Sequence, residues 1–151
     1  MKDLKKCVYY AHPMAHYDTE LEWECIETIM YMLSPIGKEP TIKDGLTLMN
    51  PNQKWLANMY QNRKGDNKVY SFAVFTEIVL ACDIVVGVTF LDGTLGAGVG
   101  QEMKVAIEND IPTYILFLDN GIKLFMPCLD IDNYKVLSIE ETRKRIDIGE
   151  K

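Results

Sequence analysis

Apolar residues recur along the chain in short runs, with segments of helical periodicity between them. Residues 7–11, 84–90 and 112–118 form nearly continuous apolar runs rich in β-branched and aromatic side chains. Such runs are typical of strands that are buried on both faces of a sheet. Residues 46–49 and 134–137 predict two shorter strands, so the pattern indicates a sheet of about five strands.

The segments between these runs carry the spacing of amphipathic helices. The first begins where Thr19 and Glu22 stand at the spacing of a capping box. A polar loop is expected over 62–67. The predicted helices cover residues 19–33, 53–61, 69–81, 99–109 and 138–146.

Alternating strands and helices predict one α/β domain over residues 1–151, with a mainly parallel sheet between two helical layers. This is the three-layer (αβα) Rossmann or flavodoxin-like architecture, in which ligands bind beyond the carboxyl ends of the strands. The loops that follow Ala11, Met49 and Phe90 are therefore expected to meet at one edge of the sheet.

Composition narrows the functional classes. The formal net charge is −6 and the isoelectric point is about 4.9, which argues against a nucleic acid polymer as partner. No stretch approaches the ~20 apolar residues of a membrane span, so a cytoplasmic protein without membrane contact is expected. The four cysteines form no CxxC pair and are expected to be free thiols.

Glu102 is the most informative candidate for chemistry. It borders the inward stripe of its predicted helix, formed by Val99, Met103, Ala106 and Asp110, rather than the solvent face. It also stands near the helix start, where unpaired N–H groups favour an anion. This placement suits a nucleophile or general base. The alternative is a glutamate that only complements the helix dipole.

A glycine-rich loop precedes that helix. Gly93, Gly96 and Gly98 allow the backbone to approach a ligand, although the spacing matches neither the dinucleotide fingerprint nor the P-loop. A purely structural turn is the alternative. Asp92, at the end of the preceding strand, is expected either to bind a sugar hydroxyl or to initiate the turn.

The first strand ends in further candidates. Alternation sends Tyr9 and Tyr10 to opposite faces, so one is expected near the binding edge unless both are core aromatics. His12 and His16 are separated by four residues, but Pro13 lies between them and no third ligand follows at short range. We therefore predict donors that line a pocket rather than a metal site.

Several segments resemble the nucleoside 2-deoxyribosyltransferase superfamily, which also contains nucleotide N-glycosidases. The resemblance is carried by residues 81–87, the Asp92-Gly93 pair, residues 96–102 and Ala106. The His12-Pro13 loop and the Asn-Pro-Asn turn that begins at Asn50 look closest to a phage and archaeal branch of that superfamily.

This resemblance implies an enzyme that acts on the N-glycosidic bond of a nucleoside or nucleotide without a cofactor, as a homo-oligomer. Glu102 would attack C1′, Tyr9 would orient it, and Asp92 would help to position the sugar. The substrate-binding residues would be His12, Pro13, Met14, His16, Asn50, Gly93, Gly96 and Gly98.

One position departs from the family pattern. Members usually carry an aspartate about two helical turns before the residue matching Asp83, and Phe75 occupies that place here. The acid for the leaving base would then be absent or come from Glu77, Asp92 or His12. A non-catalytic module that binds or senses a nucleotide is therefore the alternative. A scaffold with Trp55, Met59 and Tyr60 as its partner surface is a third possibility.

Overall fold

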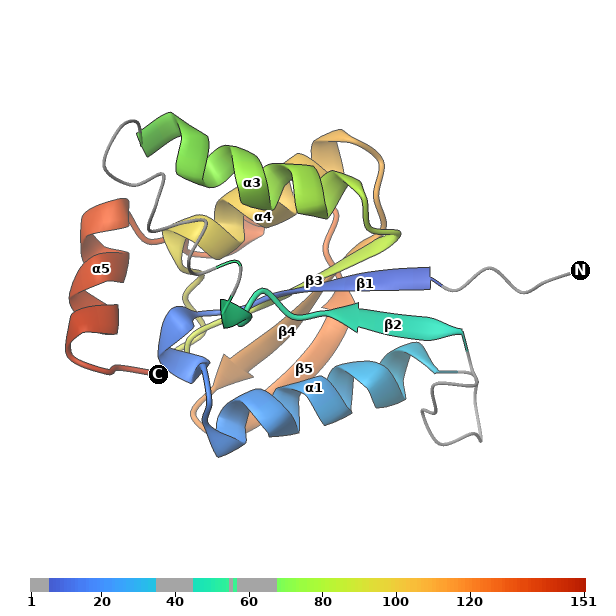
Figure 1. Cartoon of the computed structure of the whole chain (residues 1–151). Coiled ribbons are helices and arrows are strands. Elements are labelled where there is room, and N and C mark those ends of the chain that lie inside the picture. Colours follow the sequence, from blue (N-terminus) through green and yellow to red (C-terminus); the bar gives the residue numbers. More distant parts are fainter. Residues whose placement is uncertain (1–5, 35–44, 55, 57–67) are drawn as a thin grey trace, which may run out of the picture.

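The computed structural model describes residues 6–34, 45–54, 56 and 68–151. These residues form a five-stranded sheet with the strand order β2-β1-β3-β4-β5 (Figure 1). The first four strands are parallel and β5 is antiparallel to β4. The strands are β1 (Lys6–Ala11), β2 (Leu46–Met49), β3 (Ile84–Val88), β4 (Thr113–Asp119) and β5 (Ile122–Pro127).

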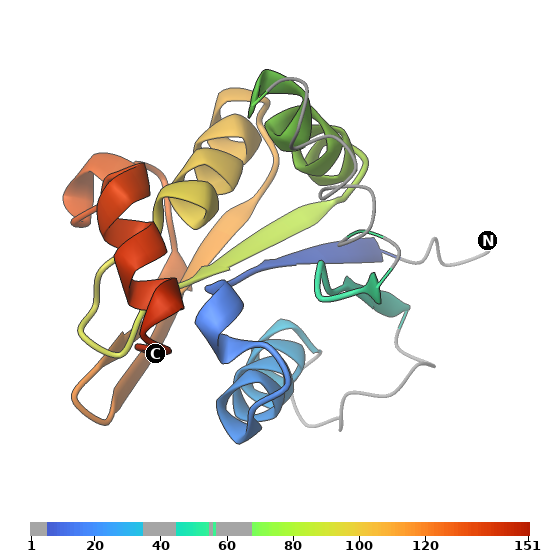
Figure 2. The same ribbon diagram turned by 60° about the vertical axis from the view of Figure 1, so that its left-hand side comes forward.

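Helices cover both faces of the sheet, which confirms the predicted α/β architecture (Figure 2). One face is covered by α1 (Glu20–Leu33), and the other by α3 (Lys68–Leu80) and α4 (Ala97–Glu108). The last helix, α5 (Ile139–Asp147), lies beyond the carboxyl ends of the strands. Short 3₁₀ helices, η1 (Met14–His16) and η3 (Ile131–Asn133), lie in the connections.

The alternation of side chains along β1 supplies both halves of the core. Tyr9 packs with Val85 and Met103 on the side of α3 and α4, whereas Tyr10 packs with Ile29 on the side of α1. The two tyrosines therefore point to opposite faces, as the strand period predicts. Only Tyr9 points to the side where α4 carries Glu102.

The prediction of a strand over 134–137 is wrong. Within that segment the structure has an isolated bridge between Leu95 and Val136. The fifth strand is β5, which pairs with β4 through a two-residue turn at Asn120 and Gly121, both with positive φ (47° and 88°). These angles fit the tight turn that Asn-Gly favours. The edge strand β5 is largely exposed, and its apolar run is short because Lys123 and Pro127 bound it.

The predicted helix over 53–61 and the loop over 62–67 fall mostly outside the described residues, as do Trp55, Met59 and Tyr60. Within the described ranges, no helix has the length and apolar character needed to cross a membrane. Since β1, β2 and β3 run in the same direction, their carboxyl ends lie at one edge of the sheet, as predicted.

Candidate functional site

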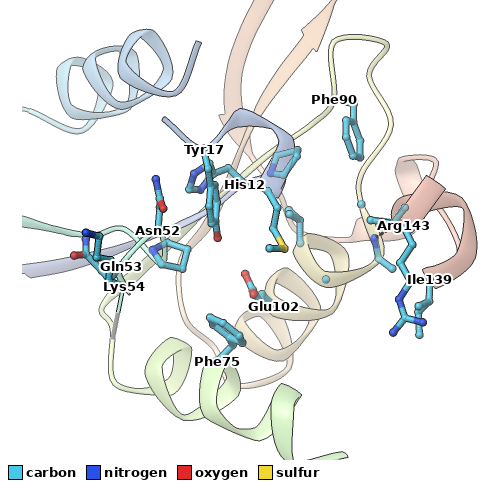
Figure 3. Close-up of a pocket in the computed structure, with 18 residues that line it drawn as sticks. His12, Tyr17, Asn52, Gln53, Lys54, Phe75, Phe90, Glu102, Ile139 and Arg143 are labelled. Carbon is cyan, nitrogen blue, oxygen red and sulfur yellow. Dashed lines mark hydrogen bonds between the residues drawn. The ribbon is translucent and has the colours of Figure 1, made fainter. Parts of the chain in front are cut away.

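A cavity of about 330 Å³ lies at this carboxyl edge. Its size is within the range of small-molecule sites. The connections after β1, β2 and β3 and the helices α3, α4 and α5 contribute residues to it, several of which are labelled in Figure 3. The lining residues include His12, Pro13, Met14 and Tyr17 after β1, Pro51 to Lys54 after β2, Phe75 of α3, Phe90, Gly96 to Val99 and Glu102 around α4, and Ile139, Thr142 and Arg143 of α5.

The wall formed by α5 is attached to the start of α4. Gly96 is the N-cap of α4 and has no side chain with which to cap it. The hydroxyl of Thr142 takes that role by accepting a hydrogen bond from the Ala97 N–H at 2.9 Å. This contact holds α5 across the glycine-rich loop and closes one side of the cavity. No local pattern in the sequence indicates it.

Glu102 reaches the cavity from α4 and its carboxyl group points into it (Figure 3). Burial raises the pKa of Glu102 to about 8, because a desolvated carboxylate is costly, and the nearby Tyr9 hydroxyl lowers it by less. The Tyr9 hydroxyl is itself buried, lies close to Glu102, and has no other hydrogen-bond partner among the described residues. A carboxyl group that lines a cavity and has a pKa raised this far is a candidate for catalysis.

A buried hydrogen bond between His12 and Glu22 supports the opposite wall. Nε2 of His12 lies 2.6 Å from Oε2 of Glu22 on α1, and Nδ1 lies 3.1 Å from the carbonyl oxygen of Tyr10. Because the carbonyl oxygen can only accept, Nδ1 must carry a hydrogen. The His12 ring also stacks on Tyr10, with 3.8 Å between ring centroids, and contacts Tyr17.

The surroundings of Glu22 favour its ionised form. The Asn52 amide donates to both carboxylate oxygens at 3.3 Å, and the Asp18 N–H donates to Oε1 at 3.4 Å. Burial acts to raise the pKa of Glu22, but hydrogen bonds from His12 and Asn52 and the charge of His12 lower it overall. With Glu22 ionised, Nε2 of His12 is the donor of the 2.6 Å hydrogen bond between the two side chains.

The structure brings part of the predicted site together. Glu102, His12, Pro13, Met14, Gly96 and Gly98 line the cavity, and Tyr9 lies directly behind Glu102. Asp92, His16, Asn50 and Gly93 do not line it.

Asp92 and His16 are occupied elsewhere. Asp92 forms an ion pair with Arg145 at 2.7 Å and accepts hydrogen bonds from Thr94. The hydrogen bond from Arg145 holds the pKa of Asp92 well below its usual range. Nε2 of His16 donates to the main-chain oxygen of Lys151 at 2.9 Å, and burial lowers the pKa of His16 to about 4.

The turn residues have structural contacts of their own. Asn50 accepts a hydrogen bond from the Asn52 N–H at 2.9 Å and so shapes the turn after β2. The cavity is also lined by Tyr17, Asn52, Thr142 and Arg143, which no sequence pattern placed at the site. The Asn-Pro-Asn turn was the available signal for Asn52.

We expect substitution of Gly93 by alanine to destabilise the fold by about 1–3 kcal/mol. Gly93 has φ 81°, and an added Cβ would lie 2.8 Å from the Phe117 ring. Gly98→Ala is the matched control, since nothing lies within 4 Å of its added Cβ and alanine suits a helix. Urea denaturation of both variants measures the difference. Equal stability of the two variants would contradict this explanation.

Comparison of the chain with protein-family models, curated proteins and solved structures gives no match in any of the three. The fold and the cavity therefore define its class: a Rossmann-like α/β domain with a ligand-sized pocket at the carboxyl edge of its sheet. Among the described residues, no group of three or more His, Cys, Asp and Glu side chains is placed to hold a metal ion.

Proposed function

We propose that the protein acts on the N-glycosidic bond of a nucleoside or nucleotide, as an N-glycosidase or deoxyribosyltransferase, with Glu102 as nucleophile. The observation that carries this proposal is the inward carboxyl group of Glu102, backed by the Tyr9 hydroxyl, in a cavity of about 330 Å³. The resemblance of the segments around Glu102 to the nucleoside 2-deoxyribosyltransferase superfamily supports it.

The chemistry needs one carboxylate placed against C1′ of the sugar. An oxygen of Glu102 forms a bond to C1′ while the C1′–N bond breaks, and the electron pair of that bond leaves with the base. Water or a second base then attacks the glycosyl ester and releases Glu102. The Tyr9 hydroxyl, which lies behind Glu102, would orient the carboxylate by a hydrogen bond.

The other walls suit a flat heterocycle. Phe75, Phe90 and Tyr17 supply aromatic surface, and Asn52 and Gln53 supply amides at the edge of the cavity. Ligand sites commonly combine apolar walls with a few polar groups that fix orientation.

The direct test is release of free base. The protein is incubated with a panel of nucleosides, deoxynucleosides and their 5′-monophosphates, with and without a second free base, and the products are separated by chromatography. We expect free base, or an exchanged nucleoside, from at least one member. Absence of any turnover across the panel would overturn the proposed activity.

A second candidate is a module that binds or senses a nucleotide without turnover. It is favoured by Phe75, which stands where the superfamily usually carries an aspartate. Glu102 is then the only carboxylate among the described residues that line the cavity, so no second acid is present there to protonate the leaving base. Calorimetric binding of a nucleotide, with no base released on long incubation, would select this candidate over the enzyme.

The rate of base release should rise with pH. Because the pKa of Glu102 is about 8 and the nucleophile must be ionised, kcat/KM is expected to increase about tenfold per pH unit below pH 8 and to level above it. The raised pKa has the opposite effect on folding stability. The stability that protonated Glu102 contributes is fully present below pH 4.5, its unfolded pKa, and is lost as the pH rises through the folded pKa of about 8. Initial rates and thermal denaturation across this range measure both. A rate that falls through pH 8 would contradict an ionised nucleophile.

A further inference from the structure

The hydroxyl group of Tyr17 has no role in the reaction proposed for Glu102 and Tyr9. The residue follows η1, where its N–H donates to the carbonyl oxygen of Met14 at 3.1 Å. Its side chain is half-buried, and in Figure 3 the hydroxyl points into the cavity on the side facing Glu102. No described residue forms a hydrogen bond with this hydroxyl. Because the hydroxyl faces the cavity, it is a donor available to a ligand.

The ring of Tyr17 is held from behind. It packs against His12 with 4.8 Å between centroids and 42° between ring planes. His12 in turn stacks on Tyr10 and pairs with Glu22, which Asn52 also contacts. These contacts hold the Tyr17 ring in one orientation, so binding a ligand costs little side-chain conformational entropy.

Tyr17 and Glu102 face one another across the cavity. Both residues line it, as Figure 3 shows, and burial, followed by the charge of Glu102, raises the pKa of Tyr17. They form no hydrogen bond with each other, and the cavity of about 330 Å³ that both line has room for atoms of a substrate. When Glu102 attacks C1′ from its side, the base must depart toward the opposite side.

We propose that the Tyr17 hydroxyl donates a hydrogen bond to the departing base and is a catalytic residue of this site. The inference rests on the proposed function. As the C1′–N bond breaks, its electron pair moves onto the base, and an acceptor atom of the base gains negative charge. The hydrogen bond from Tyr17 strengthens with that charge, which lowers the barrier more than it improves substrate binding.

The proton balance does not require Tyr17 to ionise. A phenolate there would be poorly solvated and close to a carboxyl group, so the hydroxyl keeps its proton. In hydrolysis, water attacks the glycosyl ester at C1′. One hydrogen of that water ends on the free base and its oxygen ends on the sugar, while Glu102 is regenerated.

The test compares Tyr17→Phe with the parent on two substrates that differ only in leaving-group charge: a purine nucleoside and its N7-methylated counterpart. The methylated base is cationic and leaves as a neutral molecule, so it needs little help from a donor. For the ordinary substrate we expect kcat to fall by about 10–100-fold with KM nearly unchanged. For the methylated substrate we expect a loss of no more than about threefold.

Tyr31→Phe is the control, because Tyr31 is 68% exposed on α1, away from the cavity. Equal losses on both substrates, or no loss on either, would overturn the role of Tyr17 while leaving the glycosidase activity in place. If the parent releases base from neither substrate nor from the wider panel, the proposed function itself fails and this inference fails with it.

Discussion

Replacing Glu102 by glutamine is expected to reduce base release by at least about a thousandfold without weakening the fold. Glutamine has nearly the same shape but cannot form the glycosyl ester at C1′. The loss should appear in kcat, since the cavity and its aromatic walls are retained and still bind substrate. Chromatographic assay of free base measures the effect, and calorimetry with the same substrate measures binding.

The stability of this variant provides an independent readout. The ionised form of Glu102 is disfavoured by burial, as its pKa of about 8 shows. Above that pH, the Glu102→Gln variant should therefore be as stable as the parent or more stable. Glu108→Gln is the matched control, because Glu108 lies exposed on the same helix. Base release at the parental rate by Glu102→Gln would rule out the nucleophile.

Replacing Glu22 by alanine is expected to cost about 3–5 kcal/mol of folding free energy. The substitution leaves the His12 ring buried without its partner at 2.6 Å, and removes the acceptor used by Asn52 and by the Asp18 N–H. Equilibrium denaturation in urea measures the loss. The matched control is Glu24→Ala, since Glu24 forms an exposed pair with Lys123 at 3.4 Å on the same helix. An exposed pair contributes at most about 1 kcal/mol.

Glu22→Gln separates charge from hydrogen bonding. The glutamine amide can donate to Nε2 of a neutral His12, whose Nδ1 still donates to Tyr10, so this variant should lose about 1–2 kcal/mol. The pH dependence also differs. The lowered pKa of Glu22 gives the parent stability that is present above the unfolded pKa of about 4.5 and is lost as the pH falls through the folded pKa. Neither variant should show this acid loss. A Glu22→Ala variant no less stable than Glu24→Ala would contradict a buried pair.

The hydrophobic pattern predicted most of the fold because burial has a local period. The runs that became β1, β3 and β4 are buried on both faces, so their continuous apolar character was sufficient to identify them. The same reasoning placed Glu102 at the border of an apolar helix face, and that border faces the cavity. The edge strand β5 was missed because its apolar run, bounded by Lys123 and Pro127, is short, while its Asn-Gly turn is a conformational signal rather than a hydrophobic one.

The site was less predictable because its contacts join distant residues. Glu22 stands at the capping-box spacing, and its N–H does donate to the Thr19 hydroxyl at 3.3 Å. Its carboxylate, however, pairs with His12 and Asn52 rather than with the backbone of Thr19. Asp92 was predicted to bind a sugar hydroxyl because it follows a central strand. It instead forms an ion pair with Arg145 and does not line the cavity.

The sequence by itself determined the class of sheet, the faces of Tyr9 and Tyr10, and the inward position of Glu102, because each follows from a repeat of two or 3.6 residues. The tertiary structure alone decided which polar groups meet. It joined α5 to the start of α4, paired His12 with Glu22, and left the hydroxyl of Tyr17 facing the carboxyl group of Glu102. Periodicity specifies which side of an element is buried, whereas the partners of a buried polar group depend on how separate elements pack together.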